Sequence, residues 1–566
     1  MRTKKIPDFK YFLLIVMIGC GCIGGGYFCY VSAVLSVLLL GALVYQLWCA
    51  KRLLISCDIN LLAFSLISVS YFLVSLWAVD SGMSLMGGMK FLPVILLFLL
   101  MCQITEAERQ ELIGWLPLAG SVMTVLSFLM MQIPACKTLV STAGRLGGFF
   151  QYPNTYALFM LICFIVAVLR LENLKKDWRQ AVHCLIALFG IYLSGSRTVF
   201  ALMLLCILLL LAWKKENRKY LFLCVGIFTA VLAVIFAVGG SGLMERLTTL
   251  SDQASTFWGR LLYARDAVVM IAKYPFGMGY YGYYFVQQEM QTGVYSVVSV
   301  HNEFLQLILD VGIFPAICFY GAILKSLFDR RKQGTEKLRD KLVLLVVLLH
   351  SLFDYDFQFL VMYGVLMLFL SLKDKKEIKL SMASTVAVGI GLLAVSAGAI
   401  AVGGSDYLYM QNRLESSIQF YEGNTMAKIG LLLQAEDSEN MGKTADSILE
   451  ANEHVPVAYS AKARAAFADG DVDAFIDNKL TAIRLGPYHR EEYTDYMETL
   501  AWCEQEFLKT GDTKSAAYCL ERAEEIPEML EEVKERTSTL GWKIKDQPET
   551  EISQEEQELL EEMRAM

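Results

Sequence analysis

The feature that most constrains this chain is a series of long apolar segments that recur from Tyr11 to Val402. Each is about 15 to 25 residues long, close to the roughly 20 residues that a helix needs to cross the hydrocarbon core of a bilayer. A helix pairs its own backbone groups there, whereas the strands of a membrane barrel alternate apolar and polar residues. The segments do not alternate in this way, so the sequence predicts an all-α, polytopic transmembrane bundle.

We expect about twelve to thirteen spans, several of them short enough to be broken or tightly packed helices. Residues 1–402 should therefore form one transmembrane domain, with its single long polar loop at about 240–300. The predicted spans are 11–30, 31–50, 60–79, 88–104, 112–133, 154–170, 180–194, 198–213, 219–239, 302–324, 341–353, 358–372 and 380–402.

The loops between the spans divide unequally in positive charge. Alternate loops on one side carry 26 Lys and Arg residues, whereas those on the other side carry eight. Because basic loops stay in the cytoplasm, the amino terminus is predicted to be cytoplasmic and the loop at 240–300 to face outward. An odd number of spans then also places the carboxyl-terminal region outside. Five of the eight outward cations are arginines, which favours bidentate recognition of an anion.

Residues 403–566 differ in composition from the membrane half. They carry 35 acidic and 16 basic residues, and amphipathic Ala-containing stretches end at Pro456, Pro487 and Pro527. The pair Gly470-Asp471 recurs as Gly511-Asp512. This pattern resembles degenerate tetratricopeptide-type helix pairs, which more often bind a partner than catalyse. We expect a helical repeat domain over 403–545 and an acidic tail over 546–566. The tail cysteines, Cys503 and Cys519, could form a disulfide if this region is exported.

Chemistry is expected where charged groups stand near the outer membrane surface. Arg197 lies in a short break between two spans, and Arg260 and Arg265 lie in an amphipathic helix of the long loop. His301 begins the return into the membrane and has the side chain of a general base. Each residue also has a plain interpretation: arginines snorkel to lipid headgroups, and an interfacial histidine is often structural.

Four groups of motifs stand in order along residues 140–370. They are Gly144-Arg145-Leu146-Gly147-Gly148-Phe149-Phe150 with Pro153-Asn154, Ser194-Gly195-Ser196-Arg197-Thr198, Arg260 with Pro275-Phe276-Gly277-Met278-Gly279, and His301-Asn302-Glu303-Phe304-Leu305 leading to Asp310-Val311-Gly312-Ile313. No single motif is specific. Their order, spacing and outward placement together resemble the O-antigen ligase and O-antigen polymerase superfamily of membrane proteins.

The resemblance implies a C-type glycosyltransferase of a bacterial cytoplasmic membrane that works without a metal or another cofactor. Such an enzyme takes a glycan from undecaprenyl pyrophosphate and joins it to an acceptor hydroxyl of a glycan, lipid or protein. By position, Arg197 and Arg260 would bind the pyrophosphate, and His301 would deprotonate or orient the acceptor. Arg145 and Arg265 are further candidates for the pyrophosphate site. Fixed guanidinium groups can stabilise the charge of such a leaving group.

A second polar cluster follows the eleventh predicted span. His350 and Asp354 are four residues apart and would share a helix face if the helix continues to Asp354. Similar residues in the superfamily suggest that they support the pocket or orient His301. Two alternatives remain open: an ordinary interfacial cluster, and a metal site formed by Asp354 and Asp356.

Three functions remain for the whole chain. The first is the glycan ligase or polymerase, the second a transporter or flippase of lipid-linked glycans, and the third a membrane anchor for the repeat domain. A transporter should carry charges deep within its spans, and spans one to nine show almost none away from their ends. An anchor needs neither thirteen spans nor outward arginines. We therefore expect an enzyme with lipid and glycan substrates, contact with membrane lipids, a protein partner at the repeats, and no nucleic-acid partner. The acceptor, which would separate ligase from polymerase, stays open.

Overall fold

The computed structural model describes residues 9–171, 175–213, 250–329, 334–372, 375–379 and 381–566, with isolated positions between 219 and 230. Its contacts divide the chain into two compact units. The first comprises Met1–Leu73, Leu85–Thr248 and His301–Tyr407, and the second comprises Val74–Ser84, Thr249–Val300 and Leu408–Met566. The ninth predicted span, 219–239, and the start of the long loop lie outside the described residues.

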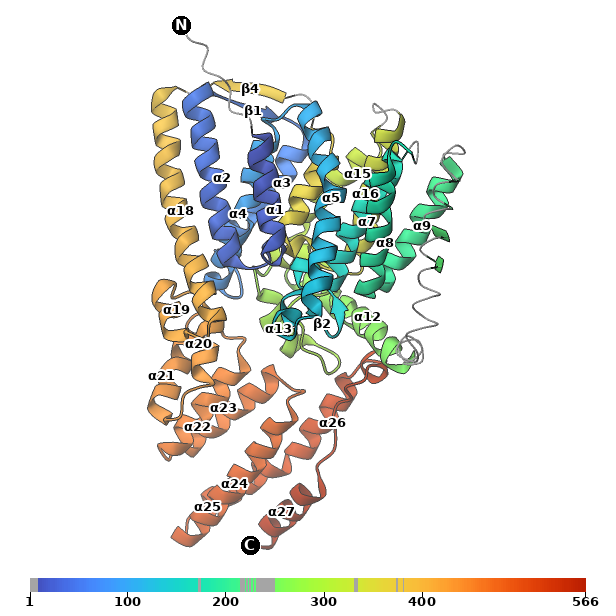
Figure 1. The fold of residues 1–566 in the computed structure, drawn as a ribbon. Helices are drawn as coiled ribbons and strands as arrows, with labels where there is room; N and C mark the ends of the chain where they lie inside the picture. The colour runs from blue at the N-terminus through green and yellow to red at the C-terminus, as the bar shows by residue number, and fades with distance from the viewer. Residues whose placement is uncertain are drawn as a thin grey trace. The chain divides into compact units, whose positions relative to one another are not determined.

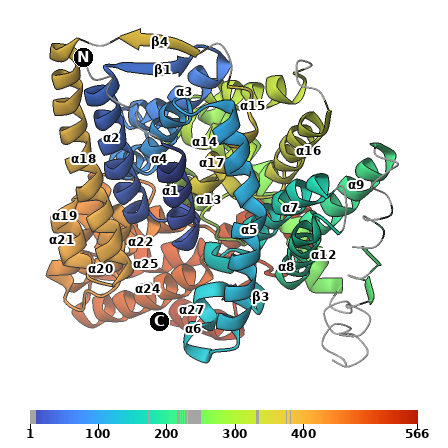
Figure 2. The ribbon, with the colours of Figure 1, turned by 45° about the horizontal axis from the view of Figure 1, so that its top comes forward.

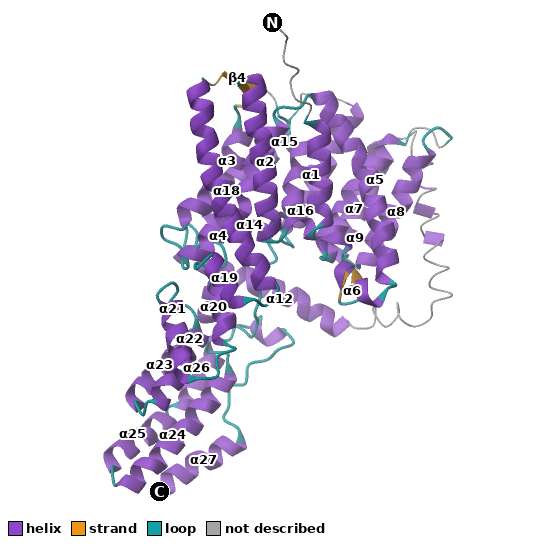
Figure 3. Ribbon diagram, turned by 60° about the vertical axis from the view of Figure 1, so that its left-hand side comes forward, coloured by secondary structure: helices purple, strands orange, loops and turns teal. Residues whose placement is uncertain are grey.

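Helices make up most of both units, as Figure 3 shows for the described part of the chain, so the all-α prediction is confirmed. Five described helices are long and apolar enough to cross a membrane, and several shorter apolar helices accompany them. The first-unit helices are α1 (Lys10–Cys22), α2 (Cys29–Ala50), α3 (Ile59–Val74), α4 (Ser81–Met101), α5 (Glu106–Met131), α7 (Pro153–Arg170), α8 (Trp178–Ser194), α9 (Arg197–Trp213), α14 (Glu303–Val311), α15 (Ile313–Leu327), α16 (Gly334–Ser351), α17 (Leu360–Phe369) and α18 (Met382–Met410).

The centre of the first unit is α7, in which every residue from Pro153 to Leu169 is buried. It packs against α5, α8, α9 and α16 (Figure 1). A helix that is apolar around its whole circumference is stable only when neighbours cover all its faces. Polar residues at the first turn of α7, Asn154 and Thr155, are therefore buried as well and require hydrogen-bond partners from other elements.

The predicted span 302–324 is broken into two helices. Gly312 has φ 91°, ends α14 and begins α15. A side chain would be strained at this positive φ, which explains the glycine. Pro315 lies within the first turn of α15, where a proline is tolerated. The break is therefore at Gly312 alone.

Two short strand pairs lie at opposite ends of the first unit. Strand β1 (Arg52–Ser56) pairs antiparallel with β4 (Lys375–Lys379) at one end, with Arg52 opposite Lys379 (Figure 2). Strands β2 (Ser141–Thr142) and β3 (Arg145–Leu146) form a second pair that follows helix α6 (Pro134–Val140). The first end carries cations that the charge count assigned to the cytoplasm, and the second carries Arg145, which it assigned to the outside.

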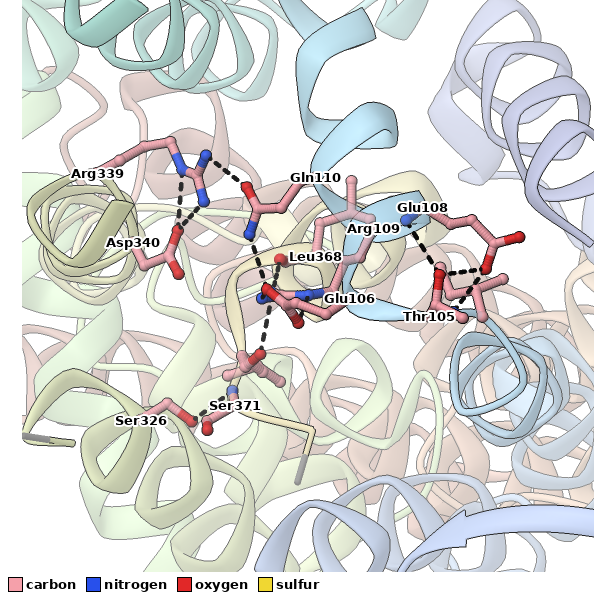
Figure 4. Close-up of polar contacts among 12 residues, drawn as sticks. Thr105, Glu106, Glu108, Arg109, Gln110, Ser326, Arg339, Asp340, Leu368 and Ser371 are labelled. Carbon is pink, nitrogen blue, oxygen red and sulfur yellow. Dashed lines mark hydrogen bonds and ion pairs between the residues drawn. The ribbon is translucent and has the colours of Figure 1, made fainter. Parts of the chain in front are cut away.

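At the β1–β4 end, two of the counted arginines have structural partners (Figure 4). The Arg109 guanidinium of α5 donates to the carbonyl oxygen of Leu368, in the last turn of α17, and to that of Leu370, just past it, and pairs with Glu106. Arg339 of α16 pairs with Asp340 at 2.7 Å and donates to Gln110 Oε1 of α5 at 2.9 Å. Cations placed at the exposed carbonyls of a helix terminus stabilise it. These residues therefore join helix ends within the bundle.

The second unit combines the long loop with the tail. Its helices are α12 (Leu250–Lys273), α13 (Gly282–Met290), α19 (Leu414–Phe420), α20 (Thr425–Leu432), α21 (Ser438–Leu449), α22 (Pro456–Ala468), α23 (Val472–Leu485), α24 (Arg490–Thr510), α25 (Thr513–Glu524), α26 (Ile526–Arg536) and α27 (Gln554–Ala565). In α12 the expected amphipathic helix is present, and it begins earlier than the apolar run that indicated it.

The tail consists of helical hairpins whose turns use the repeated Gly-Asp pairs. Gly470 and Gly511 adopt φ 78° and 77° after α22 and α24. Asp471 and Asp512 then accept backbone hydrogen bonds as the N-caps of α23 and α25. Within the acidic segment after Lys545, α27 packs against α24 and α25. Its Leu560 and Met563, with Cys503 and Cys519 as free thiols, belong to one hydrophobic core.

Hydrogen bonds join the loop to the tail within this unit. The Arg536 guanidinium donates to the carbonyl oxygen of Glu289 at 2.6 Å, and the Ser538 amide donates to that of Thr292 at 2.9 Å. His454 Nδ1 donates to the Glu289 carboxylate at 3.0 Å, and this bond lowers the pKa of Glu289. These bonds fold the loop and the tail into one unit.

Candidate active site

Five short segments of the first unit meet at the end of the bundle that carries β2 and β3. They are the turn after β3, the first turn of α7, the turn between α8 and α9, the start of α14 and the turn after α16. The predicted residues His301 and Asp354 come together there, with His301 Nδ1 at 3.5 Å from Asp354 Oδ1. The His301 side chain is partly exposed and Asp354 is 1% exposed. A buried carboxylate thus stands beside an accessible imidazole.

The backbone holds His301 in an unusual conformation. Its φ is 54°, in the left-handed region that costs a non-glycine residue on the order of 1 kcal/mol or more. The two residues that follow fix it in place. Asn302 caps α14 by accepting from the Leu305 amide at 3.0 Å and donates from its side chain to the carbonyl of Leu352. The Glu303 amide donates to the carbonyl of Asp354 at 3.0 Å. These bonds tie the His301 turn to the turn that carries Asp354.

The Asp354 carboxylate accepts from several neutral donors. Tyr152 Oη and Asn154 Nδ2 donate at 2.6 Å each, and the Tyr355 amide donates at 3.1 Å. Asn154 Oδ1 in turn accepts from Arg145 Nη2 at 2.7 Å. Charge-assisted bonds of this length fix side-chain orientation strongly. One connected path therefore runs from Arg145 through Asn154 and Asp354 to His301.

His350 does not share a helix face with Asp354, because α16 ends at Ser351 and the chain then turns. The fully buried His350 donates from Nδ1 to Asp356 Oδ2 at 2.6 Å, and Thr155 Oγ1 donates to Asp356 Oδ1 at 2.8 Å. Asp354 and Asp356 therefore accept hydrogen bonds from different residues. In the part of the chain that the structure describes, no three His, Cys, Asp or Glu side chains are grouped as metal ligands.

The predicted arginines divide between the two units. In the first, Arg145 Nε donates to the carbonyl of Ser194 at 2.8 Å, which brings it to the turn before Arg197. Arg197 begins α9 and its side chain is exposed. In the second, Arg260 is half-buried on α12, and Arg265 donates to Thr292 Oγ1 at 2.7 Å. The chain passes from the second unit to the first between Val300 and His301.

Asp266, next to Arg265, organises the long loop, and the sequence did not single it out. It is buried and accepts from the Thr292 amide at 2.9 Å, from Thr292 Oγ1 at 2.7 Å and from Tyr295 Oη at 3.0 Å. Burial raises the pKa of Asp266, and these donors act in the opposite direction. The sequence signal was an acidic residue on the apolar side of an amphipathic helix.

Lys90 lies deeper in the helical bundle than its position near the start of a predicted span indicated. Hydropathy began the span at residue 88, near Lys90, but α4 begins at Ser81 and Lys90 lies near its middle. It is 1% exposed, donates to Gln358 Oε1 at 3.2 Å and lies over the Tyr27 ring at 4.6 Å. The small and polar residues at the start of α4 lower its hydropathy, so the sequence placed the start of this span too late. Deep charge in the bundle is therefore not confined to span ends.

A second buried acid was also missed. Asp310 of α14 accepts from Tyr71 Oη at 2.8 Å and from Gln306 Nε2 at 2.8 Å. Glu303, about two helical turns earlier, accepts from the Phe357 amide at 2.9 Å. An acid within an apolar run was the available signal. Its partner Tyr71 lies 239 residues away in sequence and could not be predicted from the run.

Comparison with known proteins gives one match. Residues 182–320 match the family model described as O-Antigen ligase. The matched region contains Arg197, Arg260, Arg265 and His301, whereas Arg145, His350 and Asp354 lie outside it. No match was found among curated proteins or among solved structures. The family match and the apolar helices together support an integral membrane enzyme of the O-antigen ligase and polymerase type, acting in cell-surface polysaccharide assembly.

Proposed function

We propose that this protein transfers a glycan from an undecaprenyl-pyrophosphate-linked donor to an acceptor hydroxyl on the outer face of the cytoplasmic membrane. The observation that carries the proposal is His301, held by backbone bonds beside the buried Asp354 and connected through Asn154 to the Arg145 guanidinium. A base, its orienting carboxylate and a cation in one connected group suit transfer of a sugar from an anionic leaving group.

The proposed reaction assigns one role to each ring nitrogen of His301. Nδ1 faces Asp354, which leaves Nε2 to take the proton of the acceptor hydroxyl. The acceptor oxygen forms a bond to the anomeric carbon of the donor glycan. The bond from that carbon to the pyrophosphate oxygen breaks, and its electron pair leaves with undecaprenyl pyrophosphate. Asp354 is then a positioning residue that also balances the charge of the protonated ring.

The arginines are proposed to bind the pyrophosphate. A guanidinium offers planar, paired donors that match phosphate oxygens, and its charge needs no metal to offset the leaving group. Arg197 and Arg260 take this role, with Arg145 and Arg265 as further contributors. Of these, Arg145 is joined directly to the Asp354 group, and Arg265 is tied to Thr292 in its own unit. We therefore expect Arg145 to matter more than Arg265.

The repeat domain is proposed to lie outside the cell with the long loop, and its tetratricopeptide-like hairpins to bind an acceptor or a partner protein. This placement is supported by the contacts that fold the loop and tail into one unit. A glycan, a lipid or a protein would each present a hydroxyl to the same base. Product analysis separates them: a single addition indicates a ligase, and a ladder of repeats indicates a polymerase.

The experiment uses purified full-length protein, a lipid-linked glycan and a chelator, and measures release of undecaprenyl pyrophosphate. We expect release by the wild type, and loss of release in His301→Ala and Arg260→Ala with normal expression. His183→Ala is the matched control, because His183 pairs with Ser121 outside the proposed site. Full turnover in both site variants contradicts the assignment. Loss of wild-type turnover on chelation contradicts the metal-independent route.

A second candidate function, transport of the lipid-linked glycan, is favoured by one observation. Lys90 and Asp310 are charged residues buried within the bundle, as transporter spans often have. A transporter moves the intact donor across the bilayer without breaking the sugar–pyrophosphate bond. Proteoliposomes with a labelled donor separate the two functions, because transport changes the accessibility of the label and transfer releases the carrier.

A further inference from the structure

A pocket of about 850 Å³ lies in the first unit, where α5 and α8 begin and α7 ends. These three helices pack against one another (Figure 1). Helix α7 has 18 residues and begins at the candidate active site, so at about 1.5 Å per residue the pocket lies about 26 Å from that site. It stands at the end of the bundle that the charge count assigned to the cytoplasm. Ligand sites typically measure about 300 to 1,000 Å³, and the pocket falls within this range.

Arg170, the last residue of α7, lines this pocket and is fixed against α5. Its Nη2 donates to the carbonyl oxygen of Gln110 at 3.1 Å, and its guanidinium lies over Gly114, where a Cβ atom would collide with it. The Gln110 side chain is itself fixed, because its Oε1 accepts from Arg339 at 2.9 Å (Figure 4). A guanidinium has five N–H donors. In the part of the chain that the structure describes, Arg170 makes this one hydrogen bond and no ion pair, so it keeps donors for a ligand.

A second cation and a neutralised acid give the pocket a positive charge. Arg179 of α8 lines the pocket, is exposed and lies over the Trp178 ring at 5.8 Å. It too makes no ion pair with any described residue. Glu111 is the one carboxylate among the described lining residues, and Lys10 pairs with it at 2.7 Å. The charges of the two arginines are therefore not balanced within the pocket, which favours an anionic ligand.

The remaining lining residues indicate the depth of a lipid headgroup. Trp115 and Trp178 line the pocket and are 46% and 56% exposed. Exposed tryptophans are enriched where a membrane meets water. Along α5 the lining changes from Gln110 to Trp115 and Leu118, and Val182 continues it on α8. Leu118 and Val182 are both 40% exposed, so the pocket is polar toward the helix ends and open to hydrocarbon on its other side.

We propose that this pocket binds the headgroup of an anionic phospholipid of the cytoplasmic leaflet. The phosphate oxygens accept from Arg170 and Arg179, and the acyl chains pass over Leu118 and Val182 into the bilayer. Basic pockets between membrane helices on the cytoplasmic side are typical sites for such headgroups. A soluble phosphate compound fits less well, because it has no group for the apolar side. The bound lipid joins the ends of α5, α7 and α8, and this role does not depend on the glycan chemistry proposed above.

Three substitutions of single cations give a matched test. Arg170→Gln and Arg179→Gln each remove one charge from the pocket. Lys176→Gln removes one charge from the same connection between α7 and α8, because Lys176 is exposed and lies outside the lining. Native mass spectrometry of the purified full-length proteins measures binding of phosphatidylglycerol, of zwitterionic phosphatidylcholine, and of glycerol 3-phosphate as a soluble phosphate. Thermal unfolding of the lipid-free proteins checks that each variant is folded.

We expect each arginine variant to weaken phosphatidylglycerol binding at least fivefold and Lys176→Gln to leave it unchanged. The wild type should bind phosphatidylcholine and glycerol 3-phosphate at least fivefold more weakly than phosphatidylglycerol. Equal losses in all three variants overturn the proposal, because the attraction is then a general effect of surface charge. Glycerol 3-phosphate or phosphatidylcholine that binds as tightly as phosphatidylglycerol also overturns it. Arg179 is exposed, so unchanged binding by Arg179→Gln overturns the proposal even if Arg170→Gln does not fold.

Discussion

Replacing Asp354 by asparagine separates orientation of His301 from stability of the bundle. Asparagine keeps the shape of the side chain and one acceptor oxygen, so the bonds from Tyr152 and the Tyr355 amide to Oδ1 are retained. The other carboxylate oxygen is replaced by an NH₂ group, which is a donor. It faces Asn154 Nδ2, a second donor, which lies 2.6 Å from Asp354 Oδ2 in the wild-type structure. One charge-assisted bond is lost, and the negative charge near His301 is lost with it.

The two losses have different magnitudes. A hydrogen bond to a charged group contributes about 1.5 to 3 kcal/mol, so we expect Asp354→Asn to destabilise the protein by about 2 kcal/mol. General base catalysis contributes about 10²- to 10⁴-fold in rate, so a misoriented His301 should lower kcat by on the order of 10²-fold. Asp356→Asn is the matched control. The Asp356→Asn side chain can keep only one of the two hydrogen bonds that Asp356 accepts from Thr155 and His350, so its cost in stability is similar. These bonds do not involve His301.

The assay measures release of undecaprenyl pyrophosphate by the two asparagine variants, with thermal unfolding of the same samples. We expect Asp354→Asn to lower kcat by on the order of 10²-fold, whereas Asp356→Asn keeps a kcat near that of the wild type at a similar loss of stability. A purely structural role for Asp354 would give both variants the same kcat, and that result would refute the reasoning.

Three further outcomes follow from single contacts. Asp266→Ala leaves the two Thr292 donors and Tyr295 Oη without their acceptor, so we expect about 2 to 4 kcal/mol less stability in chemical unfolding, and an unchanged midpoint would contradict this. The pKa of Glu289 is lowered by His454, so this carboxylate stabilises the fold above its ordinary pKa and loses that effect as the pH falls through the lowered value. The melting-temperature gap between wild type and Glu289→Gln should therefore shrink on acidification below about pH 4.5, and a constant gap would exclude the contact. Gly25→Val places a side chain against Phe150 and should lower the melting temperature of the protein, whereas Gly41→Val, at a position with open space around it, should not.

The helices could largely be predicted because hydropathy reports them directly. Apart from 219–239, which lies outside the described residues, the apolar segments from Tyr11 to Val402 correspond to helices of the first unit, and one of them is broken at Gly312. Hydropathy also placed Lys90 wrongly near the end of a span, because the polar first turns of α4 have too low a hydropathy to be recognised as part of a membrane helix. Amphipathic spacing also placed α12 correctly within the long loop.

The site itself was less accessible to sequence reasoning. His301 and Asp354 were both named, yet the pairing of His350 with Asp356 and of Asp354 with Asn154 depends on where α16 ends and α7 begins. Asn154 and Asp354 are 200 residues apart in sequence, so packing determines their pairing and no local sequence pattern predicts it. The joining of the long loop to the tail was likewise not visible, because it rests on single contacts such as Arg536 to Glu289.

The central claim is that the sugar–pyrophosphate bond is broken by transfer to an acceptor. Its most direct test counts, in one purified reaction with chelator present, the undecaprenyl pyrophosphate released and the glycosidic bonds formed. The account predicts a one-to-one ratio for the wild type and neither product for His301→Ala. Release without bond formation, or bond formation that persists in His301→Ala, would contradict it.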